Sequence, residues 1–304
     1  MRVTFLGTAA ARPTVGRNVS SLMVQREGDT MMFDCGEGTQ RQMMRYGTGF
    51  SFSDIFFTHL HADHFLGVIG LLRTLGLQAR EEPMDLWAPA GTEALLEQAV
   101  NLGVERVPFE VRIHPVEPGE AVARDGYDIV PFKVSHGGRA YGWAIVEHER
   151  LGRFDAAKAR EMGIPEGPLW GKLHHGQPVE VDGRTISPAE VVGAARPGRK
   201  LVLSGDTRPC QSTREIAANA DLLIHEATFA DDEAERAAHT GHSTAREAAG
   251  IAAAANVLRL VLTHFSPRYA DDPRWLEKEA RAVFPETVAA HDGMVIEVPF
   301  RPEP

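Results

Sequence analysis

Short apolar runs alternate with amphipathic stretches along the whole chain, and this alternation is typical of an α/β protein. The apolar runs predict strands over 3–6, 21–24, 31–33, 55–57, 85–87, 109–113, 127–134, 143–146, 200–203, 222–225 and 258–262. Helical spacing predicts helices over 38–46, 65–77 and 243–255, and Ser243 or Thr244 can cap the last of them.

Polar residues follow several of these predicted strands. The strands that end near positions 134, 203 and 262 lead to His136, Asp206 and His264. In α/β proteins, rigid strands deliver functional groups at their carboxyl ends. Each residue alone also has a structural explanation, as a packed histidine or a capping carboxylate. Their shared position at strand ends is what favours a common site.

The strongest chemical signal is the run that follows the predicted strand at 55–57. It places His59, His61, Asp63 and His64 within six positions. Buried imidazoles and carboxylates are costly without partners, and a bound dication offsets that cost. Histidine suits zinc, and a mixed His/Asp set suits a catalytic site with an open position. With the three residues at strand ends, the set reaches five histidines and two aspartates, which is enough for two metals.

The segment 163–198 differs in composition from the rest of the chain. Twelve of its 36 residues are glycine or proline, which excludes a long helix or a central strand. We interpret it as an extended insertion, or arm, between two halves of one large α/β domain. A long surface loop without function is the alternative.

Charge and composition set limits on partner and compartment. The net charge of −10 argues against nucleic acid, but residues 147–200 carry nine basic against eight acidic side chains. Total charge therefore does not decide the partner. No apolar run is long enough to span a bilayer, and the start of the chain has no pattern of a signal segment. Cys35 and Cys210 make no disulfide framework, so we expect a reducing cytoplasm.

The motif HLHADH at 59–64, followed in order by His136, Asp206 and His264, resembles the metallo-β-lactamase superfamily. Further strings resemble one family within it, ribonuclease Z. These strings are FLGT at 5–8, RNVSS at 17–21, FDCGEGTQ at 33–40, SGDTR at 204–208, HEATF at 225–229, GHST at 241–244 and LTHFSPRY at 262–269. The segment GIPEGPL at 163–169 resembles that family's tRNA-gripping arm.

The resemblance implies a four-layer αββα sandwich, with a single domain over 1–304 and an inserted substrate-binding arm over 150–197. It also implies two zinc ions. One would take His59, His61 and His136, the other Asp63, His64 and His264, and Asp206 would bridge them. Manganese or iron also suits this donor set.

The implied activity is a zinc-dependent endoribonuclease that removes the 3′ trailer of precursor tRNA, leaving a 3′-hydroxyl on the tRNA and a 5′-phosphate on the trailer. His242 would be the general acid, oriented by Glu226, and Asp63 would orient the attacking water. From the sequence alone, His242 is equally explained as a neighbour of the helix cap. The resemblance further implies a homodimer.

Four basic residues are candidate RNA contacts, namely Arg17, Lys172, Arg184 and Arg268. Arg17 and Arg268 are also explained as solvated loop residues. Two other functions remain open on the same residues. One is a small-molecule phosphodiesterase, arylsulfatase or lactonase, and the other is an RNA-binding protein that keeps its metals for structure.

Overall fold

The computed structural model describes residues 1–269 and 272–301. These residues divide into two compact units. The first comprises Met1–Arg124, Asp128–Ile145 and Arg199–Pro304, and the second comprises Asp125–Tyr127 and Val146–Gly198. The candidate metal ligands all lie in the first unit, and the segment predicted as an arm lies in the second.

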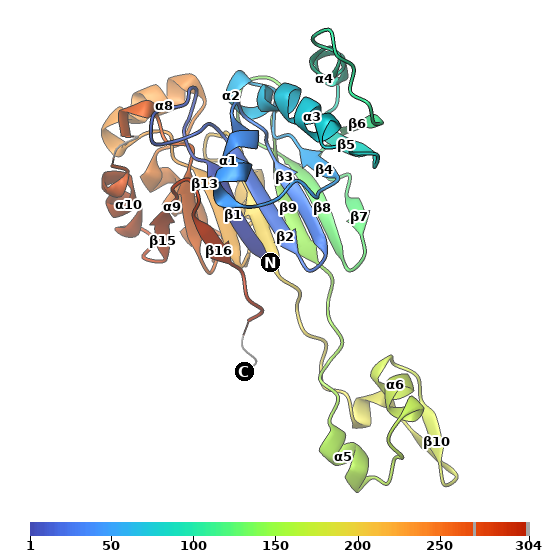
Figure 1. Cartoon of the computed structure of the whole chain (residues 1–304). Coiled ribbons are helices and arrows are strands. Elements are labelled where there is room, and N and C mark those ends of the chain that lie inside the picture. The colour runs from blue at the N-terminus through green and yellow to red at the C-terminus, as the bar shows by residue number, and fades with distance from the viewer. Residues whose placement is uncertain (270–271, 302–304) are drawn as a thin grey trace. The chain divides into compact units, whose positions relative to one another are not determined.

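Two seven-stranded sheets form the first unit over the described part of the chain (Figure 1). The first sheet has the order β16 (Val295–Glu297), β1 (Arg2–Gly7), β2 (Ser21–Arg26), β3 (Asp29–Phe33), β4 (Asp54–Phe56), β5 (Met84–Pro89), β6 (Val111–Val116). The second has the order β15 (Thr287–Ala289), β14 (Leu260–Thr263), β13 (Leu222–Glu226), β12 (Lys200–Leu203), β9 (Tyr141–Glu147), β8 (Tyr127–Lys133), β7 (Val122–Arg124).

The two sheets pack face to face through large aromatic side chains. Phe33 and Phe56 of the first sheet lie 6.4 and 5.1 Å, between ring centroids, from Trp143 of the second. The Trp143 indole nitrogen also donates to the carbonyl oxygen of Phe57 at 3.1 Å. Trp143 is fully buried, so this contact joins the sheets through both apolar area and one satisfied polar group.

Helices cover the outer face of each sheet. The first sheet packs against α1 (Thr39–Tyr46), α3 (Gly67–Leu77) and α4 (Glu93–Val100), whose apolar residues share one buried cluster with strands β1 to β5. The second sheet is covered by α9 (Ala245–Ala254) and α10 (Arg274–Arg281). The layers therefore run helix, sheet, sheet, helix, which confirms the predicted αββα sandwich (Figure 1).

Most predicted elements are present with small changes at their ends. The helix predicted over 65–77 is divided into α2 (Ala62–Phe65) and α3, which meet at Leu66. Gly67 lies there because a Cβ would fall 1.9 Å from the carbonyl oxygen of Gly36. The sequence patterns did not predict α7 (Gln211–Ile216), α8 (Ala234–Thr240), α10, or the short strands β15 and β16. The 3₁₀ turns are η1 (Pro188–Glu190), η2 (Asp231–Glu233) and η3 (Pro267–Tyr269).

The second unit has a small core of its own. It contains α5 (Ala156–Glu161), α6 (Pro168–His174) and a hairpin of β10 (Val179–Val181) and β11 (Arg184–Ile186). Its buried residues are Ala159, Ile164, Leu173, Val179, Ile186 and Val191. Its elements are short, as the glycine and proline content predicts, but the segment is folded rather than extended.

The finding on membrane-spanning helices applies to residues 1–269 and 272–301. Among them, no helix is long and apolar enough to cross a membrane.

Candidate metal centre

Parallel strand pairing brings the candidate ligands to one edge of the sandwich. Strands β12, β13 and β14 are mutually parallel, so their carboxyl ends lie side by side. Asp206 follows β12 in the chain, Glu226 is the last residue of β13, and His264 comes directly after β14. In the first sheet, β3 and β4 are also parallel, and His59 follows β4 by three residues. The polar residues that follow separate strands in the sequence therefore lie together in one site.

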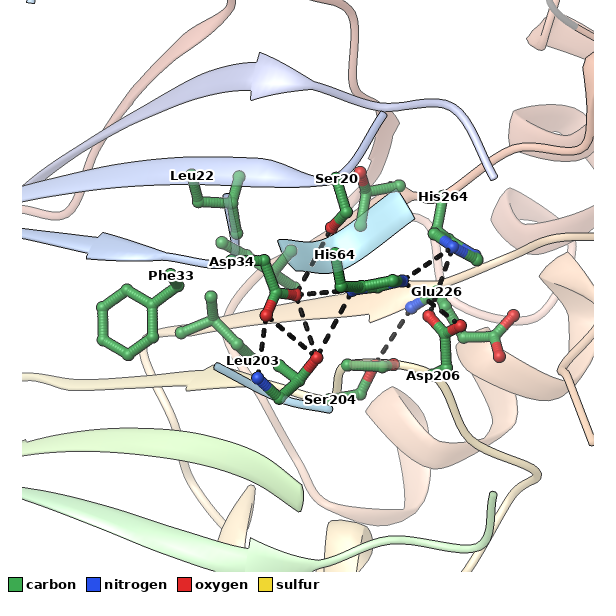
Figure 2. Close-up of a pocket in the computed structure, with 14 residues that line it drawn as sticks. Ser20, Leu22, Phe33, Asp34, His64, Leu203, Ser204, Asp206, Glu226 and His264 are labelled. Carbon is green, nitrogen blue, oxygen red and sulfur yellow. Dashed lines mark hydrogen bonds and ion pairs between the residues drawn. The ribbon is translucent and has the colours of Figure 1, made fainter. Parts of the chain in front are cut away.

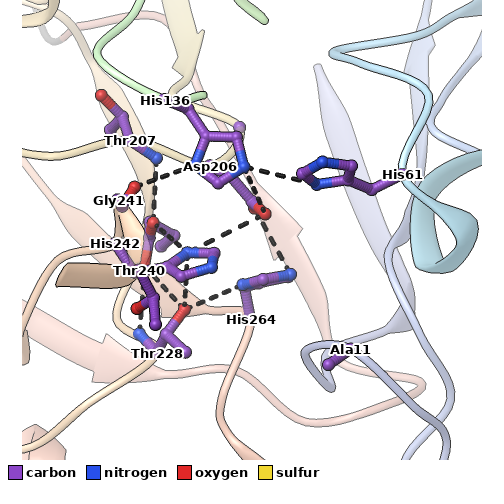
Figure 3. Close-up of polar contacts among 12 residues, drawn as sticks. Ala11, His61, His136, Asp206, Thr207, Thr228, Thr240, Gly241, His242 and His264 are labelled. Carbon is purple, nitrogen blue, oxygen red and sulfur yellow. Dashed lines mark hydrogen bonds and ion pairs between the residues drawn. The ribbon is translucent and has the colours of Figure 1, made fainter. Parts of the chain in front are cut away.

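The first group of potential ligands comprises His59, His61, His136 and Asp206. Figure 3 shows the last three of them. His59 Nε2 lies 2.9 Å from His61 Nδ1, and His136 Nε2 lies 3.4 Å from the same His61 atom. Asp206 Oδ2 lies 3.6 Å from His59 Nε2 and 4.0 Å from His136 Nε2. Three ring nitrogens and one carboxylate oxygen therefore converge.

The second group comprises Asp63, His64 and His264. His64 Nε2 and His264 Nε2 are 3.2 Å apart, and Asp63 Oδ2 lies 3.4 Å from His264 Nε2. Asp206 reaches this group as well. Its Oδ2 is 3.4 Å from His64 Nε2, and its Oδ1 is 3.3 Å from His264 Nε2. Asp206 is the carboxylate that faces both groups.

The donor set fits divalent metal ions. Within each group the potential ligand atoms lie within 4.8 Å of one another. Asp206 Oδ1 is buried, and among the described residues it accepts no hydrogen bond. An ionised oxygen left in that state is costly, and a cation satisfies it. Imidazoles combined with carboxylates suit zinc, manganese or iron.

Hydrogen bonds on the far side of four of the five imidazoles, all but that of His61, orient the other ring nitrogen toward the cluster. His136 Nδ1 donates to the carbonyl oxygen of Gly241 at 2.9 Å, and a carbonyl can only accept. The Nε2 lone pair of His136 is therefore free for a metal. The Thr228 hydroxyl donates to Glu226 Oε2, so it accepts from His264 Nδ1 at 2.9 Å, and the Nε2 atom of His264 is likewise left to face the cluster. Such partners select the tautomer and raise the basicity of a ligand.

His264 has a backbone φ of 58°, in the left-handed region that residues with a side chain rarely adopt. A strained residue of this kind persists only where its surroundings hold it, and such residues gather at functional sites. Here the strain accompanies the turn that aims the His264 ring back at the Asp206 carboxylate.

Asp34 is a buried partner of the site that our reasoning from the sequence missed. Its Oδ2 accepts from His64 Nδ1 at 2.7 Å, and its Oδ1 accepts from the backbone nitrogen of Thr58 at 2.8 Å. The Thr58 hydroxyl donates to both oxygens and lies 3.0 Å from His59 Nδ1. Asp34 directly follows β3, so the strand-end rule, applied to every predicted strand, would have found it.

The carboxylates create a strongly negative environment that attracts positive charge. Burial lowers the pKa of His64, but Asp206 and Asp34 outweigh it and hold that pKa well above its ordinary value. Burial raises the pKa of Asp206, but His264 and His64 outweigh it and hold that pKa well below its ordinary value. Asp206 is thus ionised, and its neighbourhood attracts either protons or divalent cations.

A cavity of about 30 Å³ lies between the sheets at the site (Figure 2). Asp34, His64 and Asp206 line it on the polar side, and Phe33 and Leu203 line it among apolar residues. A volume of this size holds about one water molecule. The ligands are therefore backed by a nearly dry interior, where electrostatic interactions are stronger than in water.

His242 forms a pair with Glu226, and its ring lies next to the Asp206 carboxylate. Figure 3 shows His242 and Asp206. His242 Nδ1 lies 2.8 Å from Glu226 Oε1, and Glu226 also accepts from the backbone nitrogen of Thr207 at 2.9 Å and from the Thr228 hydroxyl at 2.7 Å. Burial lowers the pKa of His242, but Glu226 outweighs it and raises that pKa to about 9. The protonated form of His242 is therefore favoured at neutral pH.

The structure places the four candidate RNA contacts in different settings. Arg17 is only 7% exposed, and its Nη1 donates to the Thr8 hydroxyl and the carbonyl oxygen of Ala290. Arg268 is exposed and lies 3.0 Å from Glu233. Lys172 on α6 and Arg184 on β11 are exposed in the second unit. These substrate contacts stay predictions.

Similarity to known proteins identifies the superfamily to which this chain belongs. A profile described as the metallo-beta-lactamase superfamily matches residues 14–264. The chain belongs to this superfamily, in agreement with its two sheets and clustered histidines and aspartates.

Relatives that match nearly the whole chain identify the family within this superfamily. Ribonuclease Z of Gemmatimonas aurantiaca is 58% identical, covering 99% of this chain and 97% of that protein, and ribonuclease Z of Myxococcus xanthus is 54% identical, covering 99% of both. The crystal structure of human tRNase Z, short form, matches with a TM-score of 0.72 and 28% identity, covering 99% of this chain and 100% of that one. Within the superfamily, the chain belongs to the ribonuclease Z family.

Proposed function

We propose that this protein is a metal-dependent endoribonuclease that removes the 3′ trailer of precursor tRNA. One observation carries the proposal, namely that two groups of potential metal ligands share Asp206 and lie beside His242, a partly buried imidazole paired with Glu226. The full-length relatives named ribonuclease Z support the choice of substrate. Metals that stabilise charge on the phosphate and an acid that protonates the leaving oxygen both promote phosphodiester hydrolysis.

We propose two zinc ions as the cofactors. His59, His61 and His136 would hold one, and Asp63, His64 and His264 the other, with Asp206 between them. The bound ions would polarise the phosphodiester and make water a better nucleophile. Metal analysis of the purified protein, with reconstitution by zinc, manganese or iron, identifies the metal that supports the highest rate.

The protein's own residues supply the proton transfers. His242 would protonate the 3′ oxygen of the tRNA as its bond to phosphorus breaks, which gives the 3′-hydroxyl. The phosphate, having gained an oxygen from water, stays on the trailer as its 5′ end. Glu226 holds the His242 ring through Nδ1 and leaves Nε2 to face the substrate. Asp63, whose side chain is 11% exposed, would orient the attacking water.

The basic side chains are proposed to contact the RNA backbone rather than its bases. Lys172 and Arg184 do so on the second unit, which we propose to be the substrate-binding arm. Arg268 is exposed next to the site, and Arg17 lines a cavity of about 220 Å³ that also includes Arg41 and Arg45. Such contacts give affinity that decreases as salt increases.

We also propose a homodimer located in a reducing compartment. The outer helices of the first sheet expose large apolar side chains that a single copy leaves in water. These are Met44 on α1, Leu66 beside α3, Leu77 at the end of α3 and Leu95 on α4. We propose that these side chains contribute to the interface between two copies. Mass measurement in solution, repeated with Leu77→Glu, tests the dimer. Both cysteines are free thiols, as a reducing compartment allows.

The experiment that tests the function is cleavage of a tRNA transcript with a 3′ extension. We expect one metal-dependent cut that leaves a 3′-hydroxyl on the tRNA and a 5′-phosphate on the trailer. Asp206→Ala should abolish it. Asp221→Ala, which removes a buried carboxylate that binds Lys200 and Arg301 instead, is the matched control and should retain the cut if it folds.

Deletion of 150–197 separates the RNA activity from a small-molecule activity. Arg150 and Arg196 are paired through their backbones, so a short linker can close the gap. The deletion should spare hydrolysis of a nitrophenyl phosphodiester and abolish tRNA cleavage. No cut by the intact protein, with the small ester still hydrolysed, contradicts the proposal and favours a small-molecule phosphodiesterase.

A further inference from the structure

Arg208 stands two residues after Asp206 and joins the loop of that ligand to the loop of His242. Its Nη1 donates to the carbonyl oxygen of His242 at 2.7 Å and to Glu247 Oε2 at 2.7 Å, and its Nη2 donates to Glu247 Oε1. The guanidinium therefore uses its planar fork to hold a backbone carbonyl and a carboxylate at once.

Glu247 is itself part of the local structure that follows His242. It is the third residue of α9, and its carboxylate accepts from the backbone nitrogen of Thr244, while the Thr244 hydroxyl accepts from the nitrogen of Glu247. This reciprocal capping box fixes the start of the helix two residues after His242. Arg208 is thereby anchored to a rigid element, and the His242 carbonyl is anchored to Arg208.

Further hydrogen bonds next to Arg208 connect the loop that carries Asp206 to the loops that carry His242 and His136. The Ser243 hydroxyl donates to the carbonyl oxygen of Thr207 at 2.5 Å, and the backbone nitrogen of Arg208 donates to Ser135, the residue before His136. His136 in turn donates to the carbonyl oxygen of Gly241, the residue before His242 (Figure 3). The segment that carries Asp206 thus sets the position of both the proton donor and one metal ligand.

From these contacts we infer that Arg208 is a positioning residue, which holds the His242 ring at its working distance from the Asp206 carboxylate through the His242 backbone. This inference rests on the proposed function. The ring and the carboxylate are 3.9 Å apart, between His242 Nδ1 and Asp206 Oδ2. Arg208 touches no ligand side chain in the contacts described, so its loss displaces the donor while the metal groups keep their own hydrogen bonds.

The effect of losing Arg208 on the rate depends on the leaving group of the substrate. The 3′ oxygen of an RNA is strongly basic and needs a proton as it leaves, whereas nitrophenolate leaves without one. A displacement of the donor by about 1 Å costs on the order of 100-fold in rate. Arg208→Ala should therefore lower kcat for precursor tRNA by about 10- to 100-fold, with KM changed by less than about threefold. The rate with bis(nitrophenyl) phosphate should fall far less.

The matched control is Arg246→Ala. Arg246 lies on α9 next to Glu247 and, like Arg208, pairs with a carboxylate, that of Asp231 at 2.6 Å, but none of its described contacts is with His242. It should leave the ratio of the two activities unchanged. Arg208→Lys keeps the charge but cannot form the fork, so it should show a smaller change in the same ratio. Added guanidinium ion should partly restore Arg208→Ala, because it can occupy the same place.

A measurement without turnover separates this inference from the proposed function. The ¹⁵N NMR signals of His242 should move in Arg208→Ala and stay in Arg246→Ala, and the metal content per chain should stay unchanged in both. If wild-type protein does not cut tRNA but the His242 signals move as stated, the proposed function fails and the positioning role stands. Equal loss of both activities, loss of metal, or unmoved His242 signals overturns the inference.

Discussion

Replacing Asp34 by asparagine tests the view that buried partners decide which imidazole nitrogen faces the metal. Asp34 accepts on one oxygen from the backbone nitrogen of Thr58 and on the other from His64 Nδ1. Asparagine keeps the shape but has one acceptor and one donor. Whichever way the amide turns, its NH₂ group faces a donor, either the Thr58 nitrogen or His64 Nδ1.

The two orientations differ in what they cost. If the NH₂ group faces Thr58, the backbone nitrogen of Thr58 stays buried without an acceptor, which costs about 1–3 kcal/mol of folding free energy. Facing His64, this group forces the ring into the other tautomer, which places a hydrogen on Nε2 where the metal would bind. Loss of such a partner typically lowers metal affinity by about 10- to 100-fold, or about 1.4–2.8 kcal/mol. We expect a loss in this range for the metal held by His64.

The assay is competition for metal between the protein and a coloured chelator, which resolves the two sites of each chain. Asp221→Asn is the matched control, because Asp221 is also buried and accepts from Lys200 and Arg301, on other elements. It should leave both affinities unchanged. The reasoning is refuted if Asp34→Asn binds both metals as tightly as wild type, or if Asp221→Asn loses affinity equally.

Three further outcomes follow from the same structure. Cleavage should decline as pH rises through the His242 pKa of about 9, because only the protonated imidazole can act as the acid. Glu226→Gln removes the carboxylate that raises this pKa most, so the decline should move to lower pH. A decline that stays at the same pH would exclude His242 as the acid. A chelator should lower the melting temperature, because metals bind the folded ligand groups in preference to the unfolded chain; an unchanged melting temperature would argue against tight binding. Trp143→Ala should cost about 3–5 kcal/mol of unfolding free energy, read from the urea midpoint, whereas exposed Trp275→Ala should cost far less.

The architecture was largely readable from the sequence because its signals are local. Alternating apolar runs marked the main strands, and the ligand set followed from polar residues placed just after them. The elements that were missed, such as α10 and the edge strands β15 and β16, are short or mostly exposed. Their formation depends on docking against the sheet rather than on a strong pattern of their own.

The candidate ligands could be selected from the sequence, because six positions concentrate four of them and the others follow strands. Their partners could not. Asp34 is bound to His64 across 30 positions, and Arg208 to Glu247 across 39. A carboxylate or guanidinium has the same local pattern whether it meets water or a buried imidazole. Only the packing of parallel strand ends brings these groups together, so the tertiary structure alone decided which tautomers, charges and proton donors the site contains.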